Sequence, residues 1–79
     1  MAFAESEKEW AERVARHLKA ELKRAGVTYE ELAQRLRDHG FEETKASITN
    51  KLSRATLSAH FFLASLAAID RYSLKIEDM

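Results

Sequence analysis

The stretch from residue 44 to residue 60 carries the side chains best suited to bind a polyanion. It contains Lys45, Lys51 and Arg54 and no acidic residue, although the whole chain has 13 basic and 13 acidic residues. A phosphate backbone responds to the local potential rather than to a net charge of zero. Asn50 lies in the same stretch, and an asparagine amide can form a bidentate pair with adenine. These residues predict DNA binding, and the alternative interpretation is a solvated charged face.

Side chains for catalysis or metal binding do not gather in the sequence. His17, His39 and His60 are far apart and no cysteine is present, whereas a zinc site needs about four converging ligands. No glycine-rich phosphate loop or nucleophile elbow occurs. We therefore expect no enzyme activity, no cofactor, no metal and no small-molecule substrate.

The elements that would position the basic stretch are helices, since proline is absent and glycine occurs twice. Apolar residues at helical spacing predict a first helix from Ser6 to Ala25, ended by Gly26. Its cations are interpreted as a solvated face: Arg13, Arg16, Lys19 and Lys23.

A second helix is predicted from a capping box formed by Thr28 and Glu31. Val27 and Leu32 occupy the positions of a hydrophobic staple, and Gly40 is expected to end the helix.

A third, short helix is predicted over residues 45–53, after a turn at residues 41–44. Thr44 is its expected cap, and Ile48 and Leu52 are expected to face the core. Its other side is polar, with Ser47 among the side chains available to DNA. A helix–turn–helix pair of this kind packs its second helix by a narrow stripe and offers the rest to the major groove.

A fourth helix over residues 58–70 is apolar nearly all round, which is typical of a central helix or of an interface. Phe61 and Phe62 are adjacent, so either this helix is enclosed on all sides or one of the two phenylalanines serves a partner, and we expect the partner. Leu74 and Ile76 alternate with polar residues in a tail that we expect to be a short strand or an extended arm. These four residues predict a homodimer interface.

Two sequence segments carry a resemblance to known proteins. Residues 26–36 resemble the entry to the helix-turn-helix of lambda-repressor-like transcription regulators, and residues 47–54 resemble their recognition helix. More narrowly, residues 50–54, 61–63 and 66–69 are similar to a family of short bacterial proteins of unknown function that are described only as helix-turn-helix-like. The resemblance implies a DNA-binding fold.

Two departures from the regulators concern the proposed DNA contacts. The regulators usually carry glutamine where Tyr29 stands, at a position that commonly touches a phosphate, so Tyr29 is expected to contact phosphate through its hydroxyl or to pack. The turn between the two helices is also longer than usual. Glu42 and Glu43 lie in it and would repel phosphate unless they turn away or pair with Lys45.

Together these patterns predict one domain over residues 1–79, an all-α, compact four-helix domain of lambda-repressor-like type. Residues 1–6 are expected to be a loose N-terminus and residues 72–79 a short C-terminal extended segment.

The expected function is a non-catalytic DNA-binding module, a cytoplasmic bacterial transcription regulator that binds double-stranded DNA. The alternative is a protein–protein interaction module that does not bind DNA. No apolar run approaches the roughly 18 residues of a membrane span, so no membrane partner is expected. The predicted DNA contacts are Tyr29, Lys45, Ser47, Asn50, Lys51 and Arg54.

Overall fold

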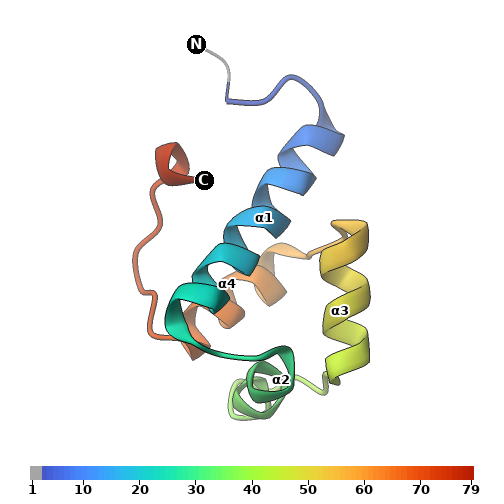
Figure 1. The fold of residues 1–79 in the computed structure, drawn as a ribbon, viewed down its shortest axis with the longest axis vertical. Coiled ribbons are helices and arrows are strands. Elements are labelled where there is room, and N and C mark those ends of the chain that lie inside the picture. Colours follow the sequence, from blue (N-terminus) through green and yellow to red (C-terminus); the bar gives the residue numbers. More distant parts are fainter. Residues whose placement is uncertain (1–2) are drawn as a thin grey trace.

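A computed structural model describes residues 3–79 and shows four α-helices (Figure 1). They are α1 (Glu7–Ala25), α2 (Tyr29–Arg37), α3 (Lys45–Arg54) and α4 (Ala59–Ala68), followed by the 3-10 helix η1 (Ile76–Asp78). No strand occurs among these residues, so the expected all-helical class is confirmed. In the C-terminal segment, residues 71–75 have no regular secondary structure and η1 follows them, so the alternative of a strand is wrong. Of the expected loose N-terminus, residues 1 and 2 lie outside the described residues, and residues 3–6 precede α1 without helix.

Each α-helix begins at a serine or threonine whose hydroxyl accepts a hydrogen bond from a backbone N–H of the first turn. The four pairs are Ser6 with Glu9, Thr28 with Glu31, Thr44 with Ser47 and Ser58 with Phe61, at 3.1–3.2 Å. At Thr28 the capping box is partial, because the Glu31 carboxylate accepts from the Thr28 hydroxyl at 3.2 Å and not from the Thr28 backbone N–H. The reciprocal box is found at Thr44, whose N–H donates to the Ser47 hydroxyl at 2.9 Å. Local sequence therefore sets where every α-helix starts.

A residue with left-handed backbone follows each of the four α-helices within three positions. Gly26 and Gly40 have φ of 69° and 85°, and the next residue donates its N–H back to a carbonyl five residues earlier. Both glycine stops are thus confirmed. Ala55 and Asp70 take the same position after α3 and α4, with φ of 54° and 60°. An L-residue there costs about 1–2 kcal/mol, so these two ends are strained.

The core lies between two pairs of helices, because α1 and α2 each pack against both α3 and α4. Phe61 and Phe62 are only 2% and 7% exposed. The ring of Phe61 lies 6.2 Å from Phe41 of the turn, and the ring of Phe62 lies 6.2 Å from His17 of α1. The expectation that one of the two phenylalanines is left for a partner is therefore wrong, since α4 is covered on both sides.

Candidate nucleic-acid interface

The exposed side of α3 is one continuous face without an acidic residue. Ile48 and Leu52 are buried and face the core, as predicted. Positions three and four residues apart share a helix face, and the exposed positions follow that spacing: Lys45, Ala46, Thr49, Asn50, Ser53 and Arg54. The face therefore has short polar side chains at its centre and a cation at each end.

Three of the predicted contact residues are together on this face: Lys45, Asn50 and Arg54. Within residues 3–79, their side chains make no hydrogen bond or ion pair with another residue of the chain. An amide and two cations that are exposed and unpaired are able to bind base edges and phosphates.

Lys51 and Ser47 lie elsewhere, on the side of α3 that faces the turn. Lys51 forms an ion pair with Glu43, and its ammonium lies 4.8 Å from the centre of the Phe61 ring. The Ser47 hydroxyl donates to the same Glu43 carboxylate at 2.6 Å. Both side chains are thus engaged by Glu43 and not directed to the exposed face of α3.

The negative charge of the Glu43 carboxylate is compensated by a lysine. Glu43 is 9% exposed, and the partner is Lys51, not the expected Lys45. Burial raises the pKa of Glu43, but the hydrogen bonds from Lys51 and Ser47 and the charge of Lys51 lower that pKa more, so the net shift is downward. The carboxylate therefore stays ionised and compensated. Glu42, by contrast, is exposed.

Tyr29 begins α2 and is half-buried against the hydrophobic core. Its ring packs, which was one of the two expected roles. Contact between its hydroxyl and a phosphate stays a prediction.

A groove between α1 and the C-terminal end of α3 was not anticipated from the sequence. Its lining residues are Glu12, Ala15, Arg16, Lys19, Leu52, Ser53 and Ala55. Arg16 and Lys19, interpreted from the sequence as part of a solvated face, thus adjoin the exposed face of α3. No sequence signal indicates this, because it depends on how α1 packs against α3.

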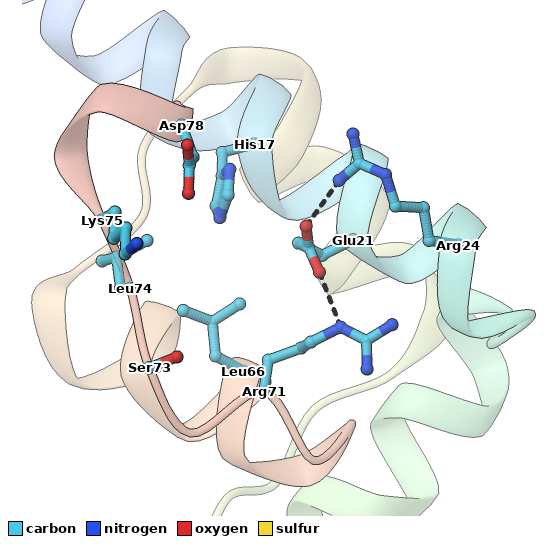
Figure 2. A pocket seen from close by; sticks show the side chains of 9 residues that line it. All are labelled: His17, Glu21, Arg24, Leu66, Arg71, Ser73, Leu74, Lys75 and Asp78. Carbon is cyan, nitrogen blue, oxygen red and sulfur yellow. Dashed lines mark hydrogen bonds and ion pairs between the residues drawn. The ribbon is translucent and has the colours of Figure 1, made fainter.

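A second hollow, of about 500 Å³, lies between α1 and the C-terminal segment (Figure 2). Glu21 lies between two arginines there, accepting hydrogen bonds from Arg71 at 2.7 Å and from Arg24 at 2.5 Å. The hydrogen bond from Arg71 is the main cause that lowers the pKa of Glu21. Residues 21 and 71 are far apart in the sequence, so this pair fastens the C-terminal segment to α1.

An exposed apolar patch lies beyond α4. Leu63, Tyr72 and Leu74 line one shallow hollow, and Ile76 is also exposed. Of the four residues predicted for an interface, Leu74 and Ile76 are thus exposed, whereas the two phenylalanines are buried. Leu63 of α4, which is 57% exposed, adds to this apolar surface.

Among residues 3–79, no three histidine, aspartate or glutamate side chains gather as metal ligands would. None of the helices in that range is long and apolar enough to cross a membrane.

Comparisons with known proteins give one match. A family model described as a domain of unknown function (DUF6471) matches residues 10–74. Neither the curated proteins nor the solved structures contain a match to the chain.

Proposed function

Because the chain belongs to the DUF6471 family, whose description names no activity, we propose from its geometry that it is a non-catalytic DNA-binding module. Its role would be that of a small transcription regulator, or of the DNA-binding domain of one, acting in the bacterial cytoplasm. The observation that carries this proposal is the exposed face of α3, with Asn50 near its centre and the unpaired cations Lys45 and Arg54 at its ends. In this reading Asn50 reads a base edge and the two cations hold phosphates.

The finer fold assignment, a lambda-repressor-like helix-turn-helix, is part of the same proposal. In support, α2 and α3 pack together, and α3 keeps its outer face free. The connection of residues 38–44 is longer than the 3–4 residues that are common in the motif. Phe41 and Glu43 of this connection are directed toward α4 and α3, so the added length does not cover the face.

The test is a binding titration of the protein against random duplex DNA at several salt concentrations. Each phosphate contact steepens the plot of log affinity against log salt by about 0.9. Two phosphate contacts from Lys45 and Arg54 therefore predict a slope of about −2 or steeper. Absence of salt-dependent binding by the folded protein would contradict the proposal.

A second candidate function is a protein–protein interaction module that does not bind DNA. The apolar patch of Leu63, Tyr72 and Leu74 favours it, since large exposed apolar side chains in one place mark interaction surfaces. A homodimer through this patch is compatible with either function. In a DNA-binding protein, a two-fold symmetric dimer contacts two half-sites and so doubles the number of base contacts. The titration above separates the two candidates.

A further inference from the structure

We propose that Arg16 and Lys19 of α1 form a second phosphate-contact site, so that a DNA backbone follows the α1 side of α3. This inference rests on the proposed DNA binding and adds the path of one strand across the protein. It gives a role to cations that lie outside the helix-turn-helix pair.

The first support is the groove itself. It measures about 230 Å³ and is lined by residues of α1 and of the C-terminal end of α3. These two helices pack side by side (Figure 1). Arg16 and Lys19 line one wall and Ser53 the other, while the buried side chains of Ala15 and Leu52 also contribute. Ser53 belongs to the exposed face of α3, so a duplex seated on that face passes the two cations.

The second support is that the two cations are free to bind. Arg16 and Lys19 are both exposed, and over residues 3–79 neither forms an ion pair. They are three residues apart and share one face of α1. Arg54, also exposed and unpaired, follows Ser53 at the same end of α3.

The third support is the contrast between the two flanks of α3. On the flank formed by the turn, the exposed cation Arg37 is offset by the exposed acid Glu42, and Lys51 is already paired with Glu43. On the α1 flank the lining residues include two cations and one acid, Glu12. A polyanion is therefore attracted to the α1 flank.

The test compares Arg16→Gln with Lys19→Gln, singly and together, in the salt titration. Glutamine keeps helix propensity at these exposed positions, so the variants should fold. Each single variant is expected to make the salt slope shallower by about one unit, and the double variant by about two. Because phosphate contacts carry no sequence information, affinity should fall by a similar factor on every duplex. Lys75→Gln, which removes an exposed lysine from the C-terminal segment, should leave the slope unchanged.

A variant that binds DNA more tightly than the parent must be folded, so misfolding cannot explain its effect. Glu12→Gln removes the acid from the groove and should tighten binding, whereas Glu77→Gln, in η1, should not. A parent that binds DNA, with an unchanged slope in the double variant, would overturn the α1 contact alone. A parent that does not bind duplex DNA would overturn the proposed function and this inference with it.

Discussion

Glu43, the residue before the N-cap of α3, forms an ion pair with Lys51, which lies two turns along the same helix. The pair joins the turn to α3 and places the lysine against the Phe61 ring. It also decides which cations of the basic stretch remain for a ligand. Within residues 3–79, Arg54 forms no ion pair, whereas Lys51 is paired with Glu43.

Substitution of Lys51 should therefore affect stability, and substitution of Arg54 should affect DNA binding. Lys51→Ala is expected to lower the free energy of unfolding by about 1–2 kcal/mol, because it leaves the buried Glu43 carboxylate unpaired. Loss of one partner from a fully buried pair costs about 3–5 kcal/mol. The side chain of Lys51 is 34% exposed, so solvent screening reduces that cost. Arg54→Ala should change stability by at most about 0.5 kcal/mol and make the salt slope of DNA binding shallower by about one unit. Thermal melts and the salt titration measure the two effects, and a reversed pattern would refute the assignment.

Stability should decrease in acid because of Glu43 and Glu21. Both carboxyls have a lowered pKa in the folded chain, so the folded state binds protons less readily than the unfolded state. Their contribution is complete above the unfolded glutamate pKa of about 4.3 and is lost as the pH falls through the lower folded value. Chemical denaturation between about pH 7 and pH 3 should show this fall in the parent. Glu43→Gln and Glu21→Gln should each be less stable near neutral pH and less sensitive to acid, and stability curves parallel to that of the parent would contradict the prediction.

The left-handed ends of α1 and α3 should respond oppositely to exchange of glycine and alanine. Ala55→Gly removes the strain of a positive φ and is expected to stabilise the protein by about 0.5–1 kcal/mol. Gly26→Ala introduces that strain and should destabilise it by about 1–2 kcal/mol. A Cβ at Gly26 would meet no atom within 4 Å, so the cost there is purely conformational. A change of 1 kcal/mol moves the melting midpoint by about 4–8 °C in a domain of this size, and shifts of the same sign in both variants would argue against this account.

Sequence preference should depend on Asn50. Asn50→Ala removes the amide that can read adenine and is expected to reduce discrimination between sites by about 1–3 kcal/mol. Affinity for random duplex should change little, since the phosphate contacts remain. Selection of bound sequences from a random pool, for parent and variant, measures the preference. An identical selected motif would show that Asn50 does not read bases.

The helix boundaries were predictable because their causes are local. Thr28, Thr44, Gly26 and Gly40 act on residues within a few positions of themselves. The two threonines cap α2 and α3 as predicted, Gly26 ends α1, and Gly40 has the expected left-handed backbone after α2, whereas the capping box predicted at Thr28 is only partial. Ala55 was not predicted as a helix end, because alanine gives no signal for a positive φ.

The candidate site was predictable only in part, because its composition depends on packing between helices. Lys51 was grouped with Arg54 on charge alone, and only the position of Glu43 separates them. Arg16 and Lys19 reach the site through the packing of α1 against α3, which residue spacing within α1 does not indicate.

Self-association, if α4 and the C-terminal segment mediate it, should depend on Leu63 and not on its neighbour Phe62. Leu63 is 57% exposed, while Phe62 is 7% exposed and lies against α1. Phe62→Ser should cost roughly 3–5 kcal/mol, as other large core truncations do, and so its effect on a dimer would be indirect. Leu63→Ser should change monomer stability by at most about 0.5 kcal/mol. Leu74→Ser should cost about 1 kcal/mol, because the Leu74 side chain is only 37% exposed. Both variants should shift a dimer toward the 9.1 kDa monomer. Sedimentation at tens of micromolar protein measures this shift, with melts of the same samples to confirm folding. A parent that sediments as a single 9.1 kDa species would rule out the dimer under these conditions. A dimer that persists in both leucine variants would place the interface on another surface.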